Sequence, residues 1–150
     1  MTTDQQSNTQ FLNVDLDIYS RSDLQPLVSA LGRKVIVLHA GRYQRIFSAH
    51  LELTRTIRSA DAAIRAFCVL IESLGRRERA LWNASRKRDF SIGVDAGAYP
   101  RAYEFALAAG TLQAAARLGA RVSIVVYAPG HSPCWGYSLA AAARASSEAV

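Results

Sequence analysis

The chain has 150 residues, half of them apolar, and its formal net charge of +6 comes from 16 arginines and only two lysines set against 12 carboxylates. This length and composition predict one globular domain with a substantial buried core, and they exclude a disordered or fibrous protein. No stretch approaches the roughly 20 consecutive apolar residues that a membrane-spanning helix needs, so we expect no membrane association.

The cellular setting follows from the N-terminus and the cysteines. Residues 1–10 are polar and lack the basic and apolar regions of a secretion signal. The two cysteines, Cys68 and Cys134, stand in unrelated contexts and do not suggest a disulfide framework. A cytoplasmic protein with free thiols is the expectation.

The domain organisation is read from the apolar patterning. We predict a single domain over residues 10–129, preceded by a disordered lead-in at residues 1–9 and followed by a tail at residues 130–150. Residues 11–19 alternate strictly between apolar and polar side chains, which is typical of a strand with one face toward water. The tail is rich in alanine and its role is left open.

The remaining elements follow in chain order from periodicity and from residues that begin or end helices. The predicted strands are residues 11–19, 35–38, 44–54, 90–95, 103–107 and 122–127, and the predicted helices are residues 23–31, 60–74, 76–83 and 111–118. The continuous apolar runs at residues 35–38 and 122–127 indicate buried strands. Alternation elsewhere favours an α+β two-layer sandwich, a mostly antiparallel sheet with helices on one face, in the order β-α-β-β-α-β-β-α-β.

The longest helix supplies the predicted core. Ser59 is the expected N-cap of residues 60–74, because its side-chain oxygen can accept from an unpaired backbone N–H of the first turn. Apolar residues recur along this helix at three- and four-residue spacing and should lie on the sheet. They are Ile64, Phe67, Cys68, Ile71 and Leu74.

A weak internal repeat of strand–helix–strand type is visible in the sequence. Residues 22–41 and residues 111–129 each read as a helix that ends at a Leu-Gly pair and is followed by a β-branched strand. The glycines, Gly32 and Gly119, are the expected left-handed helix stops. The alternative is that any two α/β units share such a stop.

A family resemblance lies in the order of several segments. They are the strand at residues 11–18, the long helix, the segment around Trp82, the strand at residues 90–94, and Leu118-Gly119-Ala120 with Tyr127. Together these segments resemble the bacterial family called domain of unknown function 4279, over most of residues 11–128. The resemblance implies a small bacterial α+β protein, some of whose relatives look like accessory or immunity-type binding proteins, and it supplies no catalytic residues.

Motifs for catalysis and cofactor binding are not found in the sequence. It has no phosphate-binding glycine loop, nucleophile elbow or zinc-protease motif, so we expect no cofactor and name no catalytic residue. The pair His131 and Cys134 falls short of the three or four ligands of a zinc site. We therefore expect no metal site.

A basic stretch brackets Trp82 and offers one candidate surface. Its members are Arg76, Arg77, Arg79, Arg86, Lys87 and Arg88. Arginine clusters can grip a phosphate backbone, but here no nucleic-acid-binding motif accompanies the cluster. A solvated rim is the favoured interpretation, and a weak nucleic-acid binder remains an alternative.

The second candidate surface is the polar face of the predicted sheet. Period-two alternation places the polar residues of each strand on the face opposite the helices. The candidate binding residues are Asp15, Asp17, His50, Glu52, Asp95 and Glu104. We predict that the protein acts by binding another protein, or by self-association, through this face. A small-ligand or metal-dependent enzyme using the same face is the alternative.

Overall fold

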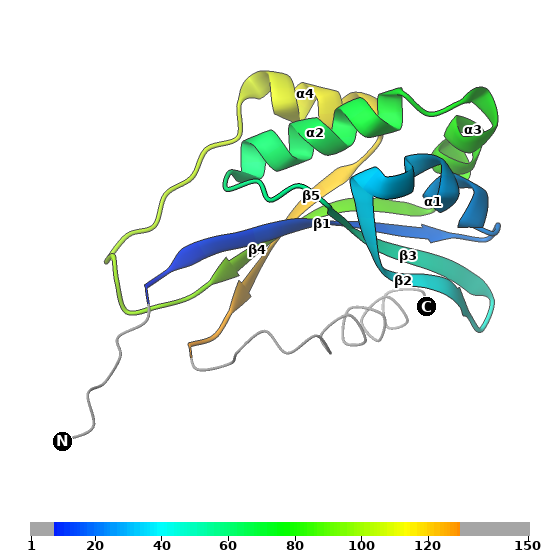
Figure 1. Ribbon diagram of the computed structural model, residues 1–150. Coiled ribbons are helices and arrows are strands. Elements are labelled where there is room, and N and C mark those ends of the chain that lie inside the picture. The colour runs from blue at the N-terminus through cyan, green and yellow to red at the C-terminus, as the bar shows by residue number, and fades with distance from the viewer. Residues whose placement is uncertain (1–7, 130–150) are drawn as a thin grey trace.

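Alternating strands and amphipathic helices assemble into two layers, and Figure 1 shows the helices of the described residues on one side of the sheet. The computed structural model describes residues 8–129, which contain five strands, four α-helices and one short 3-10 turn. The strands are β1 (Gln10–Ser20), β2 (Val35–Tyr43), β3 (Ile46–Leu53), β4 (Lys87–Asp95) and β5 (Arg121–Tyr127). The helices are α1 (Gln25–Leu31), α2 (Ala60–Glu72), α3 (Arg76–Ala84) and α4 (Ala109–Arg117), with the 3-10 turn η1 at Gly32–Lys34.

The sheet has the order β2-β3-β1-β4-β5, and every neighbouring pair is antiparallel except β4 and β5. The predicted α+β two-layer sandwich with a mostly antiparallel sheet is therefore confirmed. Because β4 and β5 are parallel, the chain must cross back over the sheet between them, and α4 makes that crossing.

Residues 103–107, which alternation predicted to be a strand, form part of the connection between β4 and α4 instead. The alternation arises because this connection lies against the domain. The Tyr103 hydroxyl accepts a hydrogen bond of 2.8 Å from the backbone N–H of Phe11, and Phe105 and Leu107 pack against the core. A segment that contacts the body on one side has the same pattern as a half-buried strand.

The two strands predicted to be buried are the two edges of the described sheet. On β2 the side chains of Ile36 and Val37 are 43% and 46% exposed, and on β5 those of Ile124 and Val126 are 57% and 62% exposed. Their apolar runs do not reflect a central position. The prediction of buried strands is wrong here. A run of β-branched residues indicates that a segment forms a strand, but it does not indicate whether that strand lies at the centre or at the edge of the sheet.

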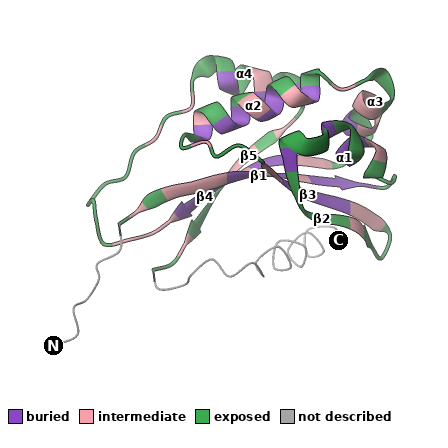
Figure 2. Cartoon of the chain, in the orientation of Figure 1, coloured by how far each residue is buried: buried purple, intermediate pink, exposed green. Residues whose placement is uncertain are grey.

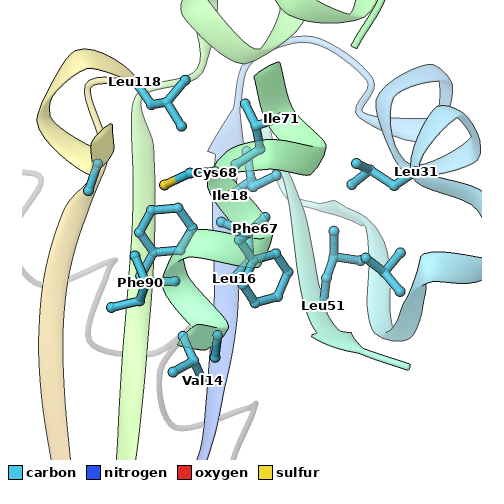
Figure 3. Close-up of a cluster of buried hydrophobic side chains, with 14 of the residues drawn as sticks. Val14, Leu16, Ile18, Leu31, Leu51, Phe67, Cys68, Ile71, Phe90 and Leu118 are labelled. Atoms are coloured by element: carbon cyan, nitrogen blue, oxygen red, sulfur yellow. The ribbon is translucent and has the colours of Figure 1, made fainter. Parts of the chain in front are cut away.

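The core lies between α2 and the middle of the sheet, as the helix stripe predicted. Ile64, Phe67 and Ile71 are fully buried, and the Phe67 ring stacks on Phe90 of β4 with centroids 5.8 Å apart. Figure 3 shows Phe67 and Cys68 of α2 directed toward β1 and β4. Ser59 caps α2 as expected, accepting from the backbone N–H of Ala62.

Two details of the predicted pattern differ in the structure. A register shift in the pairing of β1 with β4 between Phe11 and Val14 places Phe11, rather than Leu12, against the core. Helix α4 begins earlier than predicted, with Ala108 in place of Thr111 at its N-cap. Thr111 is therefore inside the helix and buried, and its side-chain oxygen accepts a hydrogen bond from Arg65.

Thr9, the last residue of the predicted lead-in, contacts the segment that follows β4. Its hydroxyl accepts from the backbone N–H of Gly97 and donates to the Gly97 carbonyl. Residues 1–7 and the predicted tail at residues 130–150 lie outside the described residues. None of the helices in residues 8–129 is long and apolar enough to cross a membrane.

Candidate functional site

Strand pairing builds the candidate site on the face of the sheet opposite the helices, called the polar face here. Asp17 of β1 stands between His50 of β3 and Asp89 of β4, and the same line continues to His39 and Arg121 at the two edges. We call this line the central row. Each of the five strands thus contributes one charged or ionisable side chain to it.

A second row runs beside the central row, two residues along each strand. Here Asp15 of β1 stands between Glu52 of β3 and Ser91 of β4, and Ser91 in turn pairs with Ser123 of β5. Two carboxyl groups directly opposite each other on neighbouring strands repel when both are ionised. The repulsion between Asp15 and Glu52 therefore has to be offset by other interactions at the centre of the site.

The Asn13 amide and a raised pKa of Asp15 both lessen that repulsion. The Asn13 amide donates one hydrogen bond of 3.0 Å to Asp15 Oδ1 and another to Glu52 Oε1, so it holds both groups together. Burial, the nearby charges of Glu52 and Asp17, and a hydrogen bond with Glu52 raise the pKa of Asp15 to about 8. The raised pKa favours the protonated form of Asp15 at neutral pH, which lessens the repulsion between the two carboxyl groups.

The central row contains a second pair, which joins a carboxyl group to an imidazole instead of to another carboxyl group. His50 Nδ1 lies 2.6 Å from Asp17 Oδ1, and the Tyr19 ring meets the imidazole edge to face at 5.6 Å. His50 is 4% exposed, and the His39 ring lies beside it. A carboxylate on Nδ1 fixes the ring orientation and leaves Nε2 as the available nitrogen. Among the described residues no hydroxyl or thiol is hydrogen-bonded to His50.

Asp89 anchors the other half of the central row. One of its oxygens, Oδ2, accepts from Arg121 at 2.7 Å and from Ser123 at 3.1 Å, and Lys87 Nζ lies 3.7 Å away. Its second oxygen is buried without a hydrogen-bond partner among the described residues, as is the Tyr19 hydroxyl. Burial, with the charges of Asp17 and Asp89, raises the pKa of Tyr19 to about 12.

Comparison with known proteins found no match: no protein-family model fits the chain, and no curated protein or solved structure is similar enough to count as a relative. What the protein does is therefore inferred from the chemistry of the polar face.

Four of the six predicted site residues come together, and two do not. Asp15, Asp17, His50 and Glu52 form the centre of the polar face. Asp95 lies on the same face at the end of β4, four residues from Ser91 and therefore about 13 Å away along the strand. Glu104 is exposed in the connection between β4 and α4 and is not part of the face.

The polar face is also less open to water than the alternation predicted. His50, Asp89, Ser48 and Tyr19 are buried, and Asp15 is half-buried. Figure 2 shows buried and intermediate classes along most of β1 and β3. The polar face was expected to be open to water, whereas several of its ionisable side chains are buried and arranged in pairs.

Asp89, Arg121 and Asn13 are site residues that were not among the predicted ones. The predicted strand begins at Phe90, one residue after Asp89, so the prediction does not include Asp89 in the sheet, whereas β4 begins at Lys87. Arg121 is separated from Asp89 by 32 residues, and only the parallel pairing of β4 with β5 brings them together. The alternation along β1 places Asn13 on the same face as Asp15 and Asp17, and this pattern could have identified Asn13 as a site residue.

The basic stretch has a structural role at three of its six positions. Arg79 donates to the carbonyl of Ile71 near the end of α2, and Arg88 donates to the carbonyls of Trp82 and Asn83 at the end of α3. Lys87 lies against the Tyr19 ring and near Asp89. Arg76, Arg77 and Arg86 remain as exposed cations.

Two further predicted features concern metal binding and thiols. In residues 8–129 no group of three histidine, cysteine, aspartate or glutamate side chains is placed to hold a metal ion. The pair His131 and Cys134 lies outside that range. Cys68 is buried in the core, where burial raises the pKa of its thiol to about 11.

Proposed function

We propose that this is a bacterial, cytoplasmic binding protein of the accessory or immunity type, and that it holds a partner protein on the polar face of its sheet. The observation that carries the proposal is the Asp15–Glu52 pair, two carboxyl groups that stand opposite each other on neighbouring strands and both accept a hydrogen bond from the Asn13 amide. Two carboxyl groups so placed form a preformed acceptor for a cation. A lysine or arginine of the partner is the matching group.

Binding of such a cation replaces the proton. With a positive charge against the pair, both carboxyl groups can ionise, because the attraction of the cation offsets their mutual repulsion. The proton leaves Asp15 as the partner arrives, so affinity rises with pH up to about 8, the pKa of Asp15 in the unbound protein, and then levels off.

The margins of the polar face supply the apolar contact that a protein interface needs. Ile36 on β2 pairs with Glu52 and is 43% exposed, and Val125 on β5 pairs with Gly93 and is 38% exposed. Both therefore lie on the same face as the carboxyl pair, one at each edge. Apolar side chains around a desolvated charge site exclude water from it.

The test uses a short arginine-rich peptide as a defined probe. We expect its binding, followed by amide chemical shifts of β1 and β3, to tighten by up to about tenfold per pH unit between about pH 6.5 and pH 8, the slope for release of one proton. Asp15→Asn should remove the pH dependence and weaken binding. Glu104→Gln, which removes an exposed carboxylate outside the face, is the matched control.

The same variants identify a natural partner. A protein that co-purifies with the wild-type chain and with Glu104→Gln, but not with Asp15→Asn, would be a partner of the polar face. Peptide binding that is independent of pH, or unchanged in Asp15→Asn, would refute the proposal. Neither the enzymatic nor the nucleic-acid alternative is favoured by a specific contact among the described residues.

A further inference from the structure

A second candidate site lies on the helix side of the molecule, remote from the polar face. It is a groove of about 810 Å³ between α2 and the segment that joins β3 to α2. Its floor is apolar and comes from both sides: Leu53 and Ile57 on one, and Ala66, Val69 and Leu70 of α2 on the other. Val69 is 59% exposed, although it is a valine in the middle of a helix. The volume falls in the range of small-molecule sites.

One rim of the groove is a cluster of cations. Arg33 and Lys34 belong to η1, and Arg55 follows β3. Thr54 joins the two segments, because its hydroxyl donates to the carbonyl of Arg33 at 2.7 Å and its backbone N–H donates to the carbonyl of Lys34 at 3.0 Å. The pairing of β2 with β3 thus fixes three cations beside one another.

No carboxylate of the described residues neutralises this cluster. Arg33, Lys34 and Arg55 form no ion pair in residues 8–129. The one carboxylate that lines the groove, Asp61, is already engaged: hydrogen bonds from the Thr111 hydroxyl and the Ala108 backbone N–H, together with Arg65, lower its pKa. Asp61 already pairs with Arg65, so the three cations of the rim keep an uncompensated positive charge.

From this combination we infer that the groove binds a single-chain anionic amphiphile, a carboxylate with a hydrocarbon chain. The chain covers the exposed apolar floor, and the carboxylate accepts hydrogen bonds from the arginines of the rim, which arginine geometry favours. The α2 side of the groove runs from Asp61 to Leu70, about 13 Å along the helix axis, which matches an extended chain of about ten carbons.

The experiment compares three probes of equal chain length, each kept below the concentration at which it forms micelles. They are decanoate, decanol and decyltrimethylammonium, titrated calorimetrically into the full chain. We expect decanoate to bind roughly tenfold or more tightly than either of the others, the size of effect that one charge-assisted hydrogen bond produces. Equal affinity for all three, or no binding of decanoate, would overturn the inference.

Two variants locate the binding. Arg55→Glu reverses a charge on the rim, and Val69→Asp places a carboxylate on the apolar floor; both positions are exposed, so the fold should persist. Each should weaken decanoate binding by roughly tenfold or more, while Arg76→Glu, a charge reversal on α3 away from the groove, should leave it unchanged. If decanoate binds all three variants as tightly as the wild type, the groove is not its site. Tight binding of an acidic amphipathic peptide with none of decanoate would likewise overturn the inference, in favour of a protein ligand.

Discussion

At the centre of the polar face, burial and neighbouring carboxyl groups raise the pKa of Asp15 well above its ordinary value. Asp15 stands opposite Glu52 and next to Asp17 along the strand, in a half-buried position, and all three circumstances disfavour its ionised form. Asp17, two residues along the same strand, is hydrogen-bonded to His50 instead. The second row therefore places two carboxyl groups together, whereas the central row places a carboxyl group beside an imidazole.

The raised pKa of Asp15 makes folding stability depend on pH. In the unfolded chain Asp15 loses its proton near pH 3.8, whereas in the folded protein it keeps the proton to about pH 8. The folded state thus binds more protons across this interval, so the contribution of Asp15 to the free energy of unfolding is greatest below about pH 4 and is lost as pH rises toward 8.

We predict that Asp15→Asn, which mimics the protonated acid, gains stability relative to the wild type as pH rises. Between about pH 5 and pH 8 the difference in unfolding free energy should shift in favour of the variant by at least about 1 kcal/mol, since one pKa unit corresponds to about 1.4 kcal/mol. Urea unfolding at several pH values measures it. Glu104→Gln should show no such shift, and a constant difference for Asp15→Asn would mean that Asp15 is ionised throughout.

The sequence predicted which residues share the polar face, but not which residues meet. Alternation is a geometric property of a strand, so Asp15 and Asp17, like His50 and Glu52, had to share a face. Slipping β1 against β3 by two residues would keep that face and pair Asp15 with His50 instead. The turns and the packing of the core decide which of the two pairings forms. The alternation of polar and apolar residues carries no information about either.

At the scale of elements, helices were more predictable than strand positions. The α2 stripe and its Ser59 cap are local features, and both are found as predicted. The apolar strands β2 and β5 are edges rather than central strands, because place in the sheet follows from the order in which distant segments pair. The prediction of a strand at residues 103–107 was wrong for a related reason. The alternate residues of this segment pack against the core, although the segment is not paired with a strand.

The basic stretch illustrates an element-level role that composition alone does not reveal. Arg79, in the first turn of α3, donates a hydrogen bond of 3.0 Å to the carbonyl of Ile71 in the last turn of α2, which also accepts from the backbone N–H of Leu74. A cation there also complements the negative end of the helix. The arginine thus ties together two consecutive helices.

We predict that Arg79→Ala lowers the free energy of unfolding by about 1 kcal/mol, the usual contribution of one such hydrogen bond. Arg76→Ala, an exposed arginine on the same helix, should change it by less than about 0.5 kcal/mol. Chemical denaturation of the two single variants provides the comparison. Equal effects would mean that the contact between Arg79 and Ile71 does not contribute to stability.

At the scale of the whole molecule, two β-α-β crossovers share one sheet. Strands β1 and β2 run in the same direction, since both are antiparallel to β3, and β4 and β5 are parallel. In the first crossover β3 occupies the place between the two parallel strands; in the second they are neighbours. The repeat suggested by the two Leu-Gly stops thus corresponds to two crossovers that differ in strand placement.

This arrangement leaves apolar side chains on both edges of the described sheet. Helix α4 packs over one end of β5, where Val122 contacts the core, while Ile124 and Val126 on the same side of the strand are more than half exposed. Exposed apolar edge strands are sites where sheets of two molecules pair, and many proteins protect them with lysine. Self-association through β5 is therefore the expectation for the isolated chain.

We predict that Ile124→Lys with Val126→Lys reduces concentration-dependent association without unfolding the domain. Both side chains are exposed, so their replacement should cost less than about 1 kcal/mol of stability, whereas lysines on the edge oppose the approach of a second sheet. Sedimentation velocity over a range of concentrations measures the association, and thermal unfolding checks the fold. Lysine at Ala116 and at Gln113, exposed on α4, adds the same charge away from the edge and serves as the control. If the edge variant and the control both associate less than the wild type and to the same extent, net charge governs self-association. If neither differs from the wild type, β5 is not the surface through which copies of the chain meet.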